Sequence, residues 1–434
     1  MVELSENIEL NDDFKRTLDL MENTNTSLLI TGKAGTGKST LLTEFVKQTK
    51  KNVVVVAPTG IAAMNIGGQT IHSFFMFPPK MLDQYDIKKV YRDIYSKVDI
   101  IIIDEISMVR ADLLDSIDMF MRLNGKDASK PFGGVQMCFF GDLYQLPPVV
   151  ENEMGAVMQK IYKSPYFFDA KVMKDFPLEI INLTKVYRQT DLSFIELLDK
   201  VRLGNIDLTA LEIINAKASE SKSKDSVVIT PTNKVADFIN NEELGKLAGK
   251  LHSYKAKIEG DFKFGITNLP IELELKLKKD AKIIFVKNDT QGRWVNGTLG
   301  IVEGLGKDFV MVKLKDNTIV TVQAVDWDKV KYDYNNSTGR ITAKVIGKIT
   351  QLPIRLAWAL TIHKVQGQTL DGVHINLSSG VWEFGHAYVA LSRCRTIEGL
   401  TLENPIWLND IKVDYRVTEF LNKKLSQSNT AEEK

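Results

Sequence analysis

A phosphate-binding loop is indicated by the segment GKAGTGKST, residues 32–40, which combines glycines with a lysine and hydroxyl residues at fixed spacing. Glycines in such a loop let backbone N–H groups wrap a phosphate chain with no side chain in the way. At its position in the motif, Lys38 can reach the β- and γ-phosphates of a nucleotide. The Ser39 hydroxyl can ligate Mg²⁺. We predict the nucleotide-binding residues of this loop to be Gly32, Gly35, Thr36, Gly37, Lys38, Ser39 and Thr40. The alternative is a chance glycine-rich turn. It is disfavoured because an apolar run precedes the loop and an amphipathic helical pattern follows it.

An acidic pair, Asp104 and Glu105, ends the strongly apolar run DIIIIDE. A carboxylate at the end of a buried strand is costly unless it faces a metal, so Asp104 is predicted to hold Mg²⁺ through water. Glu105 is placed to accept a proton from an attacking water. The alternative is that the pair only caps the next helix. An acidic pair beside a phosphate loop favours hydrolysis over phosphoryl transfer to a small acceptor.

Three further polar residues are candidates for the same chemistry. Gln145, in FFGDLYQLPPV, could contact the γ-phosphate or orient the water, although a single glutamine after a strand is usually a surface loop residue. Arg188 in VYRQT and Arg393 in YVALSRCR could each complete a phosphate site from across a domain boundary. Such an arginine accelerates phosphoryl chemistry by roughly 10³–10⁵-fold. Taken singly, each arginine is more often part of a surface ion pair.

The elements that must position these residues follow an α/β pattern. Short β-branched runs alternate with amphipathic segments up to about residue 185, which predicts a parallel sheet covered on both faces. A second α/β series begins at 226–244 and returns at 356–370. Between them, from about 251 to 350, short strands separated by Gly, Asn and Asp turns predict an inserted β-barrel. The polar end of the chain is predicted to be frayed.

Composition sets the class of protein. The 434 residues are 44% hydrophobic and 26% charged, which is an ordinary globular composition with length for two or more domains. The formal net charge of +1 argues against a protein that coats nucleic acid but allows a local basic channel. Cys138 and Cys394 lack metal-ligand spacing, and no signal peptide or membrane-length apolar run is evident. We therefore expect a soluble cytoplasmic protein that does not contact membranes.

A second set of residues is suited to a nucleic-acid strand, which is held by phosphate contacts and by base stacking. In the first α/β series the candidates are Pro58, Thr59, Gly60, His72, Phe74 and Phe77. Phe74, Phe75 and Phe77 are too closely spaced for all to be expected in one core. The alternative is that Phe75 and Phe77 pack beneath the loop. In the second series, Thr232 and Asn233 could hold a strand phosphate, or they could form an ordinary turn and helix cap.

Taken in order, these motifs resemble the Pif family of superfamily 1B DNA helicases. The motifs that carry the resemblance are GKAGTGKST, APTGIAAMNIGGQTIHSFF, IIDEISMV, PFGGVQMCFFGDLYQLPPV, YRQ, TIHKVQGQTL and YVALSRC. The resemblance spans about residues 10–400 and implies two RecA-like lobes with ATP and Mg²⁺ between them. The implied domains are lobe 1A (1–185, with a wedge at about 76–96), lobe 2A (186–250 and 351–425), an SH3-like insertion (251–350) and a disordered tail (426–434).

The resemblance also implies roles for particular residues. Arg188 and Arg393 are the implied arginine fingers. Thr361, His363 and Lys364 are expected to couple the nucleotide to DNA, with Gln366 and Gly367 nearer the nucleotide, although His363 and Lys364 could merely cap a helix. One departure is Phe14 in LNDDFKR, which stands where the family usually has a glutamine that recognises adenine. A phenylalanine could pack on a base but cannot hydrogen-bond its edge, so we expect looser discrimination among nucleoside triphosphates.

The implied activity is ATP-dependent 5′→3′ translocation on single-stranded DNA, with unwinding of duplexes, forks or G-quadruplexes in replication, repair, recombination, telomere-like or R-loop processing. The expected partners are DNA and single-strand-binding or replication proteins, with the helicase a monomer that could dimerise on DNA. Such a protein would associate with the nucleoid when bound to DNA. A P-loop kinase, a nucleotide-dependent switch and an RNA helicase are the competing hypotheses, the last because stacking and phosphate contacts do not report the 2′-hydroxyl.

Overall fold

The structure is a computed structural model that divides into two compact units. It describes residues 11–78, 80–82, 85–150, 152–187, 189, 191–223, 225–261, 269, 271–335, 337–381 and 383–432. The P-loop unit comprises Ile8–Tyr187, Lys329–Ile346 and Asp414–Lys434, and the barrel unit contains Arg188–Asp328 and Gly347–Val413. Within the described residues, no helix is both long enough and apolar enough to cross a membrane.

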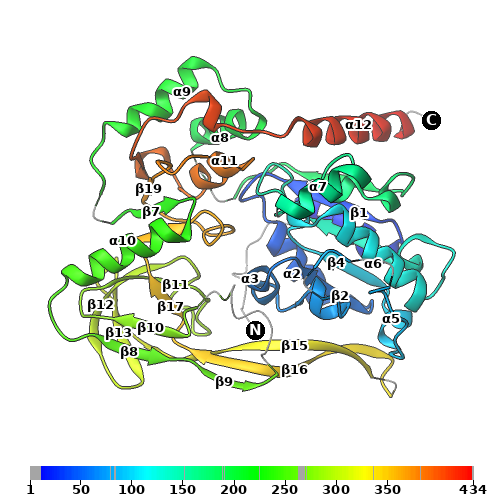
Figure 1. Cartoon of the computed structure of the whole chain (residues 1–434), viewed down its shortest axis with the longest axis horizontal. Coiled ribbons are helices and arrows are strands. Elements are labelled where there is room, and N and C mark those ends of the chain that lie inside the picture. The colour runs from blue at the N-terminus through cyan, green and yellow to red at the C-terminus, as the bar shows by residue number, and fades with distance from the viewer. Residues whose placement is uncertain are drawn as a thin grey trace. The chain divides into compact units, whose positions relative to one another are not determined.

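The core of the P-loop unit is a six-stranded sheet in the order β3-β2-β4-β5-β1-β6, and its strand pairings are parallel. The strands are β1 (Leu28–Gly32), β2 (Val53–Ala57), β3 (Gln69–Thr70), β4 (Ile100–Ile103), β5 (Gln136–Phe140) and β6 (Glu179–Leu183). Strands β1, β4 and β5 are buried at every position, as runs of Ile, Val and Leu in a doubly covered sheet should be. The predicted parallel sheet is confirmed (Figure 1).

Helices precede, connect and follow these strands along the chain. They are α1 (Asp12–Asn23), α2 (Lys38–Gln48), α3 (Gly60–Asn65), α4 (Ile71–Phe74), α5 (Ile94–Lys97), α6 (Ala111–Asn124), α7 (Asn152–Ile161) and α12 (Tyr415–Glu432). The apolar faces of α1 and α2 pack with the strands in one buried cluster that includes Phe14, Leu41 and Phe140. The motif PFGG, residues 131–134, turns back on α6, where the Asp118 carboxylate accepts the Phe132 N–H at 2.6 Å. This bond holds Phe132 in a left-handed conformation (φ 51°).

The barrel unit has its own parallel sheet, in the order β18-β7-β19-β20. Its strands are β7 (Val227–Thr230), β18 (Ala359–Thr361), β19 (Val373–Ile375) and β20 (Leu400–Leu402), and its helices are α8 (Leu192–Leu203), α9 (Leu208–Asn215), α10 (Asn233–Lys246) and α11 (His386–Leu391). The second α/β series predicted from the sequence is therefore present.

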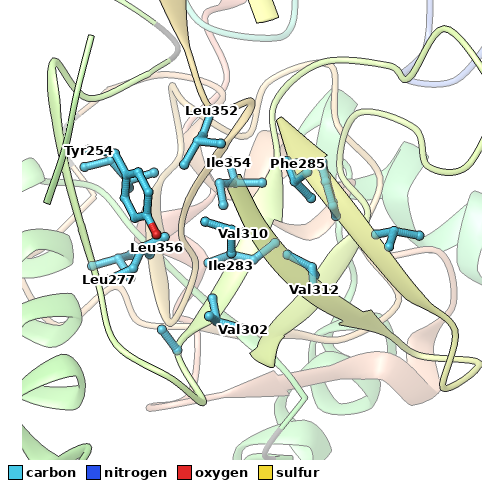
Figure 2. Packing of buried hydrophobic residues seen from close by; sticks show 14 of the residues in the cluster. Tyr254, Leu277, Ile283, Phe285, Val302, Val310, Val312, Leu352, Ile354 and Leu356 are labelled. Atoms are coloured by element: carbon cyan, nitrogen blue, oxygen red, sulfur yellow. The ribbon is translucent and has the colours of Figure 1, made fainter. Parts of the chain in front are cut away.

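The inserted barrel is built on an antiparallel sheet in the order β14-β13-β12-β11-β17. These strands are β11 (Lys282–Phe285), β12 (Leu299–Leu305), β13 (Phe309–Leu314), β14 (Ile319–Gln323) and β17 (Ile354–Leu356), with β8 (His252–Lys255) and β10 (Glu274–Leu277) forming a separate pair. Alternate residues such as Ile283, Phe285, Val310 and Val312 point into one buried cluster, as Figure 2 shows. The alternation along β13 and β14 is typical of a sheet with one buried face.

A long hairpin, β15 (Val325–Asn335) and β16 (Arg340–Gln351), extends from the barrel, and β16 pairs with β9 (Lys257–Gly260) (Figure 1). Its tip, Lys329–Ile346, groups with the P-loop unit instead of the barrel. The backbone N–H of Tyr332 donates to Gln69 Oε1 at 3.1 Å, and the Tyr332 ring packs on Phe74. The sequence prediction assigned all of residues 251–350 to the insertion. The contacts of the hairpin tip with the P-loop unit join residues that are far apart in sequence, so no local pattern indicates them.

The last helix of the chain, α12, contacts the P-loop unit through its first turns. Helix α12 continues to Glu432, and the segment Asp414–Lys434 groups with the P-loop unit. Thr418 and Phe420 of this helix contact Tyr144 and Phe168, respectively. Both contacts involve the first turns of α12 and lie before residue 426, so the frayed tail expected at 426–434 stays a prediction. Residues 433 and 434 lie outside the described residues.

Candidate nucleotide site and nucleic-acid surface

The sheet order of the P-loop unit gathers the predicted catalytic residues at one edge. Strands β4, β5, β1 and β6 are consecutive neighbours and run parallel, so their carboxyl ends lie together. The acidic pair follows β4, Gln145 follows β5, and the phosphate loop follows β1. Crevices at the carboxyl ends of parallel strands are the usual ligand sites of open α/β sheets.

The phosphate loop is formed as the motif predicts. Helix α2 begins at Lys38, and its N-cap Gly37 adopts a left-handed conformation (φ 84°, ψ 16°) that favours glycine. A Cβ at Gly37 would lie 2.8 Å from Phe14 Cζ, so no larger side chain fits. The N-terminus of α2 presents backbone N–H groups and a positive dipole end to a ligand, as an anion requires.

The Lys38 side chain folds back onto the backbone of the phosphate loop. Its ammonium donates to the carbonyl oxygens of Gly32 and Lys33 at 2.7 and 2.9 Å, and the Thr36 hydroxyl donates to Lys33 O at 3.0 Å. These carbonyls hold the cation at the mouth of the loop, where a bound triphosphate would offer it stronger, charged acceptors. The geometry fits the predicted nucleotide.

The acidic pair occupies a strained turn directly after β4. Asp104 is 9% exposed, and Glu105 has a left-handed backbone (φ 51°, ψ 46°) that is uncommon for a non-glycine residue. The Glu105 N–H donates to Asp104 Oδ1 at 2.9 Å. Burial raises the pKa of Asp104 to about 6, while the Glu105 N–H and the Lys38 ammonium oppose that rise. Within the described segment 85–150, the Glu105 side chain makes no capping bond to the following 3-10 turn, so the helix-cap alternative is not what the structure has.

A magnesium ion fits this arrangement. The buried Asp104 carboxylate is penalised by desolvation, and a divalent cation would offset that cost. Ser39, exposed in the first turn of α2, is the hydroxyl ligand of the motif. In the part of the chain that the structure describes, no group of three or more His, Cys, Asp or Glu residues could hold a metal. The ion would therefore need oxygens from nucleotide and water, as magnesium in phosphate-transfer sites usually does.

Gln145 is buried (8% exposed) and is fixed by a residue that sequence reasoning missed. Its Nε2 donates to Asp142 Oδ2 at 3.3 Å, and its backbone N–H donates to the Asp142 carbonyl at 3.0 Å. The surface-loop alternative for Gln145 is therefore wrong. The missed signal was the spacing GDxxQ, which puts Asp142 and Gln145 at the two ends of one turn.

Phe14 is 1% exposed, and its ring lies in the core beneath the phosphate loop, buried too deeply to stack on a base. Asn11 caps α1 by accepting the Phe14 N–H at 2.9 Å. The neighbouring aromatic residue is Tyr187, whose ring centroid lies 6.2 Å from that of Phe14 and whose N–H donates to Gly35 O at 2.8 Å. Tyr187 is 41% exposed and is the more accessible of the two rings, although the Lys185 ammonium lies over it at 5.2 Å from the ring centroid.

The two predicted arginine fingers have different outcomes. Arg188 lies outside the described residues. Arg393 is completely buried, and its guanidinium donates to the carbonyl oxygens of Val365 and Gln368 at 3.3 and 3.2 Å. Arg393 is therefore not part of a surface ion pair, and it organises the backbone on both sides of Gln366 and Gly367, the latter in a left-handed conformation (φ 79°).

The strand-binding candidates of the P-loop unit follow β2 and β3. Pro58 directly follows β2, and the Thr59 hydroxyl caps α3, which begins at Gly60, by accepting the Ala62 N–H at 3.2 Å. A hydroxyl that accepts one bond still has a proton to donate to a phosphate. His72 lies on α4, where burial and the nearby Arg110 lower its pKa.

The prediction that Phe74 and Phe77 stack on bases is wrong for this structure. Phe74, Phe75 and Phe77 are 1%, 1% and 6% exposed, so the expectation that they cannot all face one core is also wrong. Phe75 and Phe77 both pack edge-on against Phe120, with ring centroids at 5.4 and 5.7 Å. Edge-to-face contacts in a dry core hold such rings more firmly than a water-exposed groove would.

In the barrel unit, the corresponding candidates follow the adjacent strands β7 and β18. The Thr232 hydroxyl caps α10, which begins at Asn233, by accepting the Val235 N–H at 3.3 Å. This is the same cap that Thr59 makes in the other unit. Thr361 ends β18 and is 3% exposed, whereas His363 is exposed and Lys364 is half-buried. The sheet thus brings the 232–233 and 361–364 segments to one edge.

A phosphate loop on β1, an acidic pair after β4 and a buried glutamine after β5 define a P-loop nucleoside triphosphatase with RecA-like parallel sheets. The comparisons with known proteins identify the family. The model of the PIF1-like helicase family matches residues 9–212. The crystal structure of Bacteroides sp Pif1 in complex with ADP-AlF4 superposes with a TM-score of 0.88 at 33% identity, covering 98% of this chain and 99% of that one. The chain belongs to the PIF1-like helicase family.

Two curated relatives extend the comparison. The ATP-dependent DNA helicase PIF1 of Homo sapiens is 35% identical over 391 residues, which are 86% of this chain and 58% of the human protein. The ATP-dependent DNA helicase Pif1 of Campylobacter jejuni is 28% identical over 433 residues, covering 92% of this chain and 94% of its own length. The chain thus spans a little over half of the human relative and nearly all of the bacterial one. The Bacteroides protein bound to ssDNA superposes with a TM-score of 0.70.

Proposed function

We propose that this protein is an ATP-dependent DNA helicase that hydrolyses ATP with Mg²⁺ and moves 5′→3′ along single-stranded DNA. The observation that carries the proposal is the set of parallel carboxyl ends in the P-loop unit, where phosphate loop, acidic pair and glutamine meet at one sheet edge. The 5′→3′ direction is proposed from the family resemblance and not from the geometry.

With the exception of Arg188, the hydrolytic step uses groups whose positions are described. Lys38 leaves its loop carbonyls for the β- and γ-phosphates and neutralises charge as it develops. Glu105, held in its strained turn, accepts the proton of the attacking water, and Gln145 orients that water. Ser39 and Asp104 would hold Mg²⁺, which supplies Lewis-acid stabilisation of the phosphate oxygens. Arg188 and Arg393 are the proposed transition-state arginines.

The DNA contacts are proposed on the two threonine caps. Thr59 and Thr232 stand at the N-termini of helices α3 and α10, where hydroxyl and backbone N–H groups together favour a phosphate. Each unit carries one such contact, and Thr361, His363 and Lys364 lie beside the second. Burial, and secondarily the nearby Arg355, lower the pKa of Lys364, and a bound strand phosphate would oppose both effects. A contact on each unit is what stepwise movement requires.

The substrates are proposed from the relatives. Bacteroides Pif1 has been solved bound to ssDNA, and another solved structure concerns DNA unwinding at forked dsDNA by two coordinating Pif1 helicases. We propose single-stranded and forked DNA as the substrates of this chain, with a second copy as a DNA-dependent partner. G-quadruplexes, R-loops and single-strand-binding proteins are finer proposals that the family suggests.

The deciding experiment compares duplexes that carry either a 5′ or a 3′ single-stranded DNA tail, with ATP hydrolysis followed in the same reactions. Unwinding from the 5′ tail alone, with DNA-stimulated hydrolysis, is the expected result. Unwinding from the 3′ tail alone would overturn the direction. DNA-independent hydrolysis without unwinding would favour the nucleotide switch. A matched RNA-tailed set tests the RNA helicase alternative, because only contacts to the 2′-hydroxyl would make RNA the better substrate.

A further inference from the structure

The loop after β5 contains a carboxylate that the proposed hydrolytic step does not use. Asp142 is 1% exposed and lies two residues after the end of the strand. The intervening Gly141 passes so close to the turn of the acidic pair that a Cβ there would lie 3.0 Å from Ile106 Cγ2. A buried carboxylate at this position is costly unless it is hydrogen-bonded, so its partners are informative.

Both carboxylate oxygens accept hydrogen bonds from the same short loop. Asp142 Oδ1 accepts the Tyr144 N–H at 3.3 Å, and Oδ2 accepts Nε2 of Gln145, also at 3.3 Å. The Gln145 backbone N–H closes the turn on the Asp142 carbonyl at 3.0 Å. A carboxylate is acceptor-only when ionised, so it can bind the nitrogen end of the Gln145 amide but not the oxygen end.

We infer that Asp142 is a positioning residue that fixes which way the Gln145 amide faces, and so presents Gln145 Oε1 as the acceptor for the attacking water. Because Nε2 faces Asp142, the amide oxygen is directed away from the carboxylate. An acceptor at that point can accept a hydrogen bond from the water and align its lone pair, while Glu105 takes the proton, whereas a flipped amide would offer only donors there. This inference rests on the proposed hydrolytic function.

The isosteric change Asp142→Asn tests the role directly. The oxygen of the new amide would still accept the Tyr144 N–H, and the nitrogen of that amide would then face Nε2 of Gln145, so the Gln145 amide should turn over. We expect kcat for ssDNA-stimulated ATP hydrolysis to fall by roughly ten- to a hundredfold, with KM for ATP unchanged. In a Gln145→Ala background the same change should have almost no effect on kcat, because Asp142 would have no amide to orient.

Two outcomes would overturn the inference. One is an Asp142→Asn protein with wild-type kcat, and the other is an equal loss of kcat in the Gln145 and Gln145→Ala backgrounds. Asp118→Asn is the matched control, since Asp118 is also buried and also accepts a backbone N–H in the same unit. Its kcat should equal that of the wild type.

A second variant keeps the test decisive if Asp142→Asn does not fold. Gln145→Glu places two carboxyl groups side by side, which then share one proton at low pH and repel when both ionise. Its kcat should therefore fall as pH rises through the raised pKa of the pair, a limb absent from the wild-type profile. A Gln145→Glu profile that parallels the wild type would overturn the inference. If wild-type protein does not hydrolyse ATP on ssDNA, the proposed function itself fails.

Discussion

The ring of Phe14 lies directly beneath Gly37, so the phosphate loop rests at this point on an aromatic core residue and not on a hydrogen-bonding group. The family resemblance implies a glutamine at the position of Phe14. Its burial means that this position contributes packing to the loop and no recognition of a base edge. Neighbouring polar side chains are committed elsewhere, because Asn11 caps α1 and Asp13 accepts the Thr184 hydroxyl at 3.4 Å.

Weak selectivity for the nucleobase is the first prediction. Because position 14 contributes packing and no hydrogen-bonding group, ATP and GTP should differ in kcat/KM by about tenfold or less on saturating ssDNA. Sites that hydrogen-bond their substrate discriminate by roughly 10⁴–10⁵, whereas apolar sites manage roughly 10–200. Steady-state kinetics with ATP, GTP, CTP and UTP provide the measurement. A protein that turns over ATP while GTP is inert would contradict this prediction.

The second prediction concerns the removal of Lys38, the cation of the phosphate loop. Lys38→Ala should abolish ATP hydrolysis without unfolding the protein, since the Lys38 ammonium donates to the carbonyls of its own loop, and water can replace it there. Hydrolysis and the thermal midpoint are measured on the same preparation. Lys47→Ala, at the opposite end of α2, is the matched control and should hydrolyse ATP normally. Retained turnover in Lys38→Ala would exclude this loop as the nucleotide site.

Arg393→Ala should lose two properties together. As a proposed arginine finger, Arg393 accounts for roughly 10³–10⁵-fold in turnover, while nucleotide affinity stays nearly normal. As a buried donor to Val365 and Gln368, it also supports the local fold, and leaving those carbonyls unsatisfied should cost about 1–3 kcal/mol each. Turnover, fluorescent-nucleotide binding and denaturant unfolding separate these effects. Full turnover in the variant would remove Arg393 from the finger role.

The matched caps Thr59 and Thr232 give a prediction about DNA. Thr→Val at either position removes the hydroxyl, should destabilise the protein by about 1 kcal/mol, and should weaken ssDNA binding. Thr→Ser keeps the hydroxyl and should restore both properties. Fluorescence anisotropy with labelled oligonucleotides at fixed salt measures affinity, because salt alone changes phosphate contacts strongly. If Thr→Val loses stability but binds DNA as tightly as Thr→Ser, the threonines are helix caps only.

Much of the nucleotide site could be predicted from the sequence because its motifs are local. Lys38, Ser39 and Asp104 follow strands whose apolar runs are unmistakable, and each lies where the strand–loop–helix pattern puts it. The hydrogen bond between Asp142 and Gln145 could also have been predicted, since both residues belong to one turn. Local spacing therefore determines this part of the molecule.

The remainder depended on contacts between distant parts of the chain. From the sequence alone, Phe74 and Phe77 are candidates for base stacking. In the structure, Tyr95 packs against Phe74 and Phe120 packs against Phe77. Tyr332 donates its backbone N–H to Gln69 from 263 positions away, and no periodicity in either segment signals that bond. Burial of aromatic residues is decided by such tertiary partners and not by their own spacing.

The membership of the hairpin tip in the P-loop unit has a consequence for biosynthesis. A chain emerging from the ribosome completes β1 to β6 by residue 183, yet Lys329–Ile346 and Asp414–Lys434, which pack with those strands, are made much later. The P-loop unit cannot finish folding until these segments have been made. Until then, the apolar surface around Phe74, which Tyr332 later covers, stays exposed. Folding of this unit is therefore governed by contacts of high sequence separation, which are formed slowly. A fragment that stops at Tyr187 would lack two of its three parts, and we expect it to aggregate.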